Sequence, residues 1–228
     1  MKKKIILVAI IIVLAIVGVV GYMLASSLMQ EITLRKEADT IGKLDITKDS
    51  IDMEVKTKGD YGVVEKTMKE YMNTYGTTCK ELMDILQDDQ MGKILTAENY
   101  KNDGKEFVKT KEYITKTKTD FNEKINKLIE MSSEEKMMEG IKEKQLEESY
   151  VELYKEIMLG NEIKQDLQEV VKDLEQASKA INNRLEVEEK IINLLVENKD
   201  KWNVNDNDEV EFETQKLVDE YNNLISSL

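Results

Sequence analysis

The chain has 228 residues, of which 41% are hydrophobic, 35% charged and 6% aromatic, and its formal net charge is −13. It contains no His and a single Cys, which excludes His-based catalysis, internal disulfides and thiolate metal clusters. The acidic balance disfavours nucleic acid as a partner, and the absence of Pro favours long, uninterrupted helices.

An uncharged apolar segment lies near the N-terminus. Ile5–Leu24 would span about 30 Å as a helix, which is the thickness of the hydrocarbon layer of a membrane. Because Lys2–Lys4 precede it, we predict a cytoplasmic stub over residues 1–4, a single membrane anchor over residues 5–28 and an extracytoplasmic remainder. The alternative is a cleaved signal peptide ending near Ala25, although its apolar core would be unusually long.

Residues 29–59 are expected to form a juxtamembrane helix and a linker. Gly42 is a suitable end for that helix. Beyond it, Ile51, Met53 and Val55 alternate weakly with polar residues, which permits a short strand, but an irregular linker is favoured.

The first helix of the outer region is predicted to start at Asp60, a suitable N-cap residue. Its apolar residues recur at intervals of three and four and define one helical face: Val64, Met68, Tyr71, Tyr75, Cys79, Leu82 and Leu86. Cys79 lies on this face, so we interpret it as a small buried apolar residue, with an intermolecular disulfide as the alternative.

A second helix is predicted after a break at Met91-Gly92-Lys93. Thr96 is its expected N-cap, and the helix should run to Met131-Ser132-Ser133. Its apolar stripe is thin: Tyr100, Phe107, Ile114, Phe121, Ile125 and Leu128. Such a helix needs a partner helix to stabilise it.

The segment 143–199 keeps a heptad spacing of apolar residues from Leu146 to Leu195, which predicts coiled-coil-like packing. Gly160-Asn161 is the expected position of a kink or turn, so the segment could be one helix or two. Residues 202–212 fit either a small β-hairpin or an extended cap, and a last helix should follow from Leu217.

Residues that could carry chemistry have simpler structural interpretations. The acidic cluster of Asp206, Asp208, Glu209 and Glu211 lacks the Gly and the spacing of a calcium loop, so we favour a solvated turn. Met137-Met138 are interpreted as core residues, and Trp202 as packing the hairpin onto helices rather than stacking on a glycan. We predict no catalytic, cofactor-binding or metal-binding residues.

Taken together, the sequence predicts an all-α protein: one N-terminal transmembrane helix, then an elongated antiparallel helical bundle or coiled-coil-like domain over residues 60–228. Only Arg35 and Arg184 are arginines among 33 basic residues, a usage typical of AT-rich Gram-positive bacteria.

The expected function is a structural or protein-interaction module at the cell envelope, without catalysis. It would associate with the membrane through residues 5–28, and with a protein partner or itself through its apolar helical stripes. The alternative is an extracytoplasmic ligand-binding or sensor module for a cell-wall fragment or peptide, with Trp202 and Tyr221 as its platform.

Overall fold

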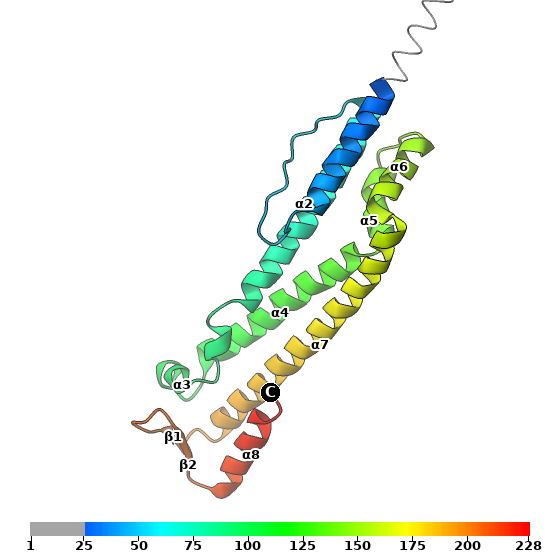
Figure 1. The fold of residues 1–228 in the computed structure, drawn as a ribbon. Coiled ribbons are helices and arrows are strands. Elements are labelled where there is room, and N and C mark those ends of the chain that lie inside the picture. The colour runs from blue at the N-terminus through cyan, green and yellow to red at the C-terminus, as the bar shows by residue number, and fades with distance from the viewer. Residues whose placement is uncertain (1–25) are drawn as a thin grey trace, which may run out of the picture. The chain divides into compact units, whose positions relative to one another are not determined.

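A computed structural model describes residues 26–228 of the protein, except for the side chains of residues 161, 162 and 165. The predicted stub 1–4 and the predicted anchor 5–28 lie outside the described residues, apart from residues 26–28. Between residues 26 and 228, no helix combines the length and the hydrophobicity needed to cross a membrane. This part of the chain is a mostly helical bundle with one small antiparallel hairpin (Figure 1).

The regular elements follow one another along the chain with short connections, apart from the segment 43–58. In order they are a helix over residues 26–42, α2 (Gly59–Leu86), the 3-10 helix η1 (Met91–Lys93), α3 (Ala97–Asp103), α4 (Val108–Met131), α5 (Glu134–Lys142), α6 (Glu148–Leu159), α7 (Asn161–Glu197), β1 (Trp202–Val204), β2 (Val210–Phe212) and α8 (Gln215–Ile225).

The chain divides into two compact units. Unit 1 contains the described residues up to Thr74 together with Glu134–Ile163, and unit 2 contains Tyr75–Ser133 and Lys164–Leu228. The sequence does not indicate this division, because α2 and α7 contribute residues to both units and neither helix is interrupted where the units meet.

Most of the predicted helix ends are confirmed. The helix over 26–42 ends at Gly42, and the Thr96 side chain caps α3 by accepting a hydrogen bond from the Asn99 amide. The heptad segment contains two helices rather than one: its first residues, 143–147, are not helical, and Gly160 adopts an extended conformation (φ −52°, ψ 156°) between α6 and α7. The predicted hairpin is present, with Trp202 paired to Phe212 across the two strands.

The prediction of a single helix between residues 97 and 131 is wrong. Gly104 (φ 74°) and Phe107 (φ 49°) both adopt left-handed conformations and separate α3 from α4. The Asp103 carboxylate accepts hydrogen bonds from the amides of Lys109 (3.1 Å) and Thr110 (2.7 Å), which satisfies the free N–H groups at the start of α4. This turn places the Phe107 ring, which is fully buried, in the core of unit 2.

The core of unit 1 is rich in methionine. The interpretation of Met137 and Met138 as core residues is confirmed, because both are almost fully buried, together with Met68 and Met158. The Tyr154 hydroxyl is buried as well and donates a hydrogen bond to the Met137 carbonyl (3.1 Å), which joins α6 to α5. Flexible thioether side chains suit the irregular space between these short helices.

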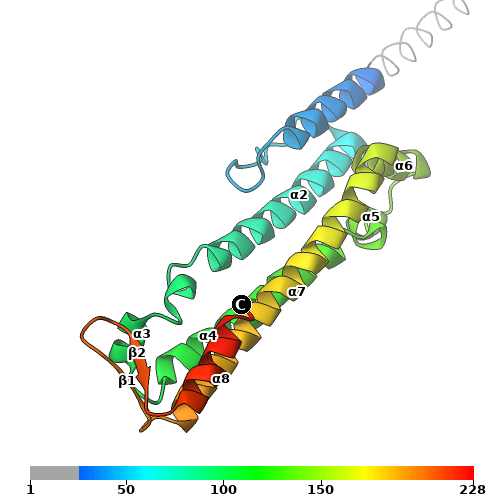
Figure 2. The ribbon, with the colours of Figure 1, turned by 60° about the horizontal axis from the view of Figure 1, so that its bottom comes forward.

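The core of unit 2 has two parts. One joins the end of α2 to α4 and α7 around Leu82, Phe121 and Ile125. The other collects aromatic rings from α3, α4, the hairpin and α8, where α8 runs back beside the C-terminal part of α7 (Figure 2). Leu185, Ile191, Ile192 and Leu195 of α7 are fully buried, so the C-terminal half of the predicted heptad stripe forms core.

Candidate functional site

Unit 1 contains an open pocket of about 580 Å³ between the helix over 26–42, the start of α2 and α6. Its lining is mostly polar and includes three carboxylates and one guanidinium. The lining residues are Ser27, Glu31, Arg35, Tyr61, Ser149, Tyr150, Glu152, Leu153 and Glu156.

Arg35 organises the charges of this pocket. Its guanidinium donates two hydrogen bonds to the Glu156 carboxylate (3.2 and 3.0 Å) and one to Glu31 (3.0 Å). The bonds to Glu156 and then those to Glu31 raise the pKa of Arg35, and the contact with Arg35 lowers the pKa of Glu156. Because these side chains are largely exposed, the ion pairs contribute little stability, but the two-point contact fixes the orientation of the three groups.

Two tyrosines form the apolar side of the pocket. The rings of Tyr61 and Tyr150 meet edge to face, with their centroids 5.0 Å apart. The hydroxyls of Tyr61 and Ser27 share a hydrogen bond of 2.9 Å, which ties α2 to the first turn of the helix over 26–42. With aromatic rings beside three carboxylates and one arginine, the pocket favours a ligand that carries a cationic group.

A network of charged side chains is buried in the same unit. The Lys69 side chain is only 1% exposed, and its ammonium lies 2.8 Å from Glu65 and 3.0 Å from Glu37. Glu65 is completely buried and lies one helical turn before Lys69 on α2, whereas Glu37 comes from the helix over 26–42. Lys69 therefore joins two helices through a charge-assisted contact that is shielded from water.

Both carboxylates of the network stay charged despite their burial. Burial alone would raise the pKa of Glu65, but hydrogen bonds from Lys69 and from the backbone amides of Lys56 and Thr57 outweigh it, so the pKa is lowered. Burial of Glu37 is likewise outweighed by hydrogen bonds from Lys56 and Lys69, and its pKa is lowered too. The pKa of Lys69 is raised, because its two carboxylate partners outweigh the effect of burial.

The same network fixes the segment 43–58, which contains no regular element. The amides of Lys56 and Thr57 donate hydrogen bonds to the Glu65 carboxylate (2.8–3.0 Å), and the Lys56 ammonium bonds to Glu37 (3.0 Å). The linker favoured by the sequence is therefore irregular in backbone but held by buried contacts. A Cβ atom at Gly62 would lie 3.0 Å from the Thr57 carbonyl oxygen, so a larger residue there would require the backbone of the segment 43–58 to shift slightly.

Trp202 is buried in unit 2 and takes no part in a surface site. Its ring is 4% exposed, stacks on Phe107 at 5.8 Å and donates its N–H to the Leu195 carbonyl (2.8 Å). The Lys105 ammonium covers the ring face at 3.9 Å and bonds to the Trp202 carbonyl. The interpretation that Trp202 packs the hairpin onto the helices is confirmed, and its ring is not available as a binding platform.

Glu188 is a buried carboxylate of α7 with an incomplete set of hydrogen bonds. One of its oxygens accepts a bond from Arg184 (2.9 Å), whereas Oε2 has no hydrogen-bond partner among the described residues. Burial raises the pKa of Glu188, and Arg184 offsets only part of this effect. The sequence places Glu188 on the heptad stripe, so an acidic side chain occupies a position that faces the core.

The Asn205 side chain organises the backbone of the acidic turn in the hairpin. The Asn205 side-chain oxygen accepts bonds from the amides of Asn207 (2.9 Å) and Glu209 (3.0 Å), and Asp208 pairs with Lys101 (2.7 Å). Within residues 26–228, no group of three His, Cys, Asp or Glu side chains is placed to hold a metal ion. Cys79 is a partly buried free thiol, and burial raises its pKa, which lowers its reactivity.

Comparison with protein-family models, with curated proteins and with solved structures finds no match for this chain. The amino-acid sequence indicates neither the pocket nor the buried charge network, because each combines residues that are far apart in the chain.

Proposed function

We propose that this protein is a membrane-anchored helical module of the cell envelope that acts outside the cytoplasm as a structural or protein-interaction element, without catalytic chemistry. The observation that carries this proposal is the buried contact of Lys69 with Glu65 and Glu37. It fixes the helix that follows the uncharged N-terminal segment to α2. A fixed connection of this kind is what a module needs in order to hold a partner at a set distance from the membrane. A flexible linker would instead let the anchor and the helices after it move independently.

We also propose that the outer region is an elongated antiparallel, coiled-coil-like bundle. Two contacts between α4 and α7 support this. Asn122 and Asn182 exchange side-chain hydrogen bonds (3.0 and 2.8 Å), and Lys118 lies 3.5 Å from Glu186. Lys118 lies four residues before Asn122 on α4, whereas its partner Glu186 lies four residues after Asn182 on α7. Contacts in this opposite order are expected for antiparallel helices.

The partner surface is proposed to lie on apolar helical residues that the bundle leaves uncovered. In unit 2, Val170 of α7 is 37% exposed, although it belongs to the helix that carries the heptad stripe. A helix of a partner protein, or of a second copy, could pack against such residues. The strongly acidic composition disfavours nucleic acid as the partner.

A membrane-impermeant crosslinker applied to intact cells tests this function and the orientation together. The full-length chain carries a C-terminal tag, and crosslinked products are purified through the tag and identified by mass spectrometry. We expect one dominant protein partner or a ladder of self-crosslinks. A tag that is protected from both crosslinker and external protease until the cells are opened would contradict the extracytoplasmic orientation.

The second candidate function is ligand binding, and the pocket lined by Tyr61 and Tyr150 favours it. Its carboxylates suit a peptide or wall fragment with a free amino group. We expect such a ligand to raise the unfolding temperature of the full-length protein in detergent, and Tyr150→Ala to abolish the shift. Tyr113→Ala, in unit 2, is the matched control and should retain it, and an unchanged shift in Tyr150→Ala would remove this candidate.

A further inference from the structure

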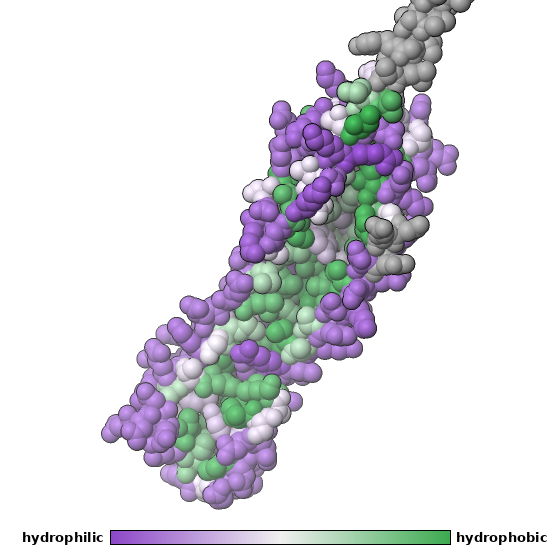
Figure 3. Space-filling model, in the orientation of Figure 1, coloured by the Kyte–Doolittle hydropathy of each residue, from purple (hydrophilic) through white to green (hydrophobic). Residues whose placement is uncertain are grey.

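The helix over 26–42 exposes three large apolar side chains near its start. Leu28 is 60%, Met29 62% and Ile32 53% exposed, and their spacing places them on one side of the helix. The opposite side is buried in unit 1 through Leu34 and Ile41. Figure 3 shows apolar surface at this end of the described chain, next to polar surface further along.

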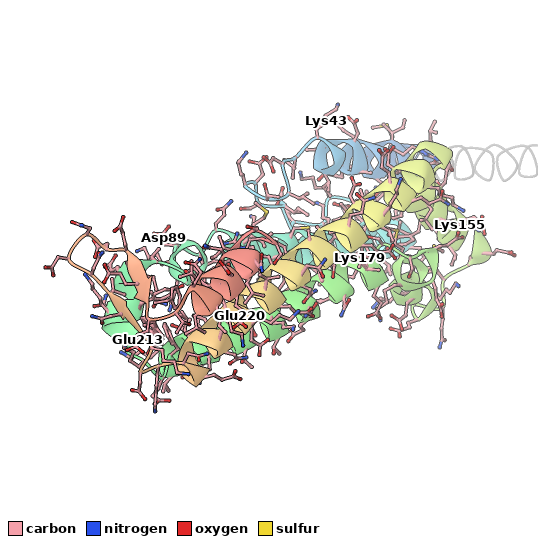
Figure 4. All side chains as sticks on the ribbon, turned by 90° about the horizontal axis from the view of Figure 1, so that it is seen from below. Lys43, Asp89, Lys155, Lys179, Glu213 and Glu220 are labelled. Carbon is pink, nitrogen blue, oxygen red and sulfur yellow. The ribbon has the colours of Figure 1, made fainter. Side chains whose placement is uncertain are left out.

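The same exposed side becomes charged one turn further along. Lys36, Asp39 and Lys43 follow Ile32 at helical spacing and are all exposed. Lys43 projects outward from the end of the helix (Figure 4). An exposed helical side that changes from apolar to charged residues within one turn is the pattern expected where a helix passes from lipid into water.

The length of the uncharged sequence places this change at the membrane surface. No charged residue occurs between Ile5 and Gln30, and a helix over that stretch would be about 39 Å long at 1.5 Å per residue. A bilayer with its headgroups is about 40–45 Å thick. With Lys2–Lys4 at one surface, Leu28 and Met29 fall within the opposite headgroup region, and Glu31 is the first charge at its outer edge.

Lipid fits these three residues better than a protein partner does. A stable protein interface involves about 20–30 residues on each side. The apolar part of this surface consists of only three residues, and the charged part begins at Lys36. Tyr61 bonds to Ser27 at the same level of the helix, and Tyr150 packs on Tyr61. Tyrosine is enriched where proteins meet the headgroup region.

We infer that the first two turns of the helix over 26–42 lie in the headgroup region of the bilayer, with Leu28, Met29 and Ile32 in contact with lipid. This inference rests on the proposed membrane anchor. It adds that the pocket beside Ser27 and Tyr61 opens at the membrane surface, so its ligands or partners are met there rather than in free solution.

The test uses the full-length protein with Cys79→Ala, carrying single cysteines labelled with the environment-sensitive dye NBD. Positions 28, 29 and 32 are compared with positions 36, 39 and 43, which lie on the same exposed side. The labelled protein is reconstituted into phosphatidylcholine vesicles with or without a lipid that carries a doxyl quencher near its headgroup. We expect blue-shifted emission and at least twofold quenching at 28, 29 and 32, with water-like emission at 36, 39 and 43.

The outcomes separate this inference from the function on which it rests. If the protein does not float with the vesicles, the membrane anchor is wrong and both proposals fail. If it floats but the labels at 28, 29 and 32 emit as in water, only the present inference is overturned. Blue-shifted emission without quenching by doxyl lipid would show that protein, such as a second copy, covers the surface, and would also overturn it. Should Cys79→Ala fail to fold, photo-crosslinking amino acids at the same positions of the native chain give the equivalent readout through lipid adducts.

Discussion

The ammonium of Lys69 lies 2.8 Å from the carboxylate of Glu65, and both side chains are almost completely removed from water. On the same helix, Lys66 and Glu70 have the identical spacing of four residues, but they are 65% and 51% exposed and 3.8 Å apart. The two pairs join the same two kinds of side chain at the same spacing. They differ in burial, in the order of Glu and Lys, and in the further partners of the buried pair, which are Glu37 and two backbone amides. They therefore provide a matched test of what the buried network contributes.

Lys69→Met should destabilise unit 1 by about 3–5 kcal/mol, because it leaves the charges of Glu65 and Glu37 buried with fewer partners. Lys66→Met, at the exposed pair, should change the free energy of unfolding by less than about 1 kcal/mol. Denaturant unfolding of the full-length protein, with hydrogen exchange to localise the effect to the helix over 26–42 and α2, measures both. Equal small effects would show that the network does not hold these helices together.

The stability of unit 1 should fall in acid. The pKa values of Glu37 and Glu65 are lower in the folded protein than the ordinary value of 4.5 that applies to the unfolded chain. The contribution of these carboxylates is therefore complete above about pH 4.5 and is lost as the pH falls through the lowered values. Unfolding free energies measured between pH 7 and pH 3 should show this decline. Glu65→Gln should show a smaller slope, and an equal slope would assign the acid sensitivity to other groups.

How far the sequence reveals these elements depends on whether their signals are local. Apolar residues at intervals of three and four, the Thr96 cap and Gly160 act within one or two turns, and they correctly predicted most of the helices and the break between α6 and α7. The turn at Gly104 and Phe107 was missed because a non-glycine residue in a left-handed conformation has no strong sequence signal. Asp103, two amides of α4 and the aromatic core stabilise it together.

The charge network and the pocket could not have been predicted. A Glu and a Lys four residues apart look alike in the sequence whether the pair is exposed or buried. Lys66 and Glu70 form an exposed pair, and Glu65 and Lys69 form a buried one. Burial of Glu65 and Lys69 depends on Glu37 and on the backbone of the segment 43–58. The pocket similarly requires Ser27, Tyr61 and Tyr150 to meet, and only the packing of three separate helices brings them together.

Trp202 should report its burial in fluorescence. Because its ring is covered by Phe107 and Lys105 and its N–H is bonded to Leu195, we expect blue-shifted emission and weak quenching by iodide in the folded protein. Unfolding should shift the emission to the red and restore quenching. Added cell-wall fragments should leave the emission unchanged, and strong quenching by them in the folded state would mean that the hairpin opens to bind them.

Glu188→Met should stabilise unit 2 by about 1–3 kcal/mol at neutral pH, because it replaces a buried carboxylate that lacks one hydrogen bond with an apolar side chain of similar length. Arg184, which is partly exposed, can regain water when its partner is removed.

The pH dependence of the unfolding free energy tests this explanation for Glu188 more directly. Since burial raises the folded pKa of Glu188 above its ordinary 4.5, the native protein holds this proton more tightly than the unfolded chain. The carboxylate therefore reduces stability as the pH rises through that raised value, and the variant lacks this loss. The stability difference between Glu188→Met and the native chain should consequently grow between pH 4 and pH 7. A difference that is constant with pH, or a variant less stable than the native chain at pH 7, would mean that the pair with Arg184 outweighs the burial of the charge.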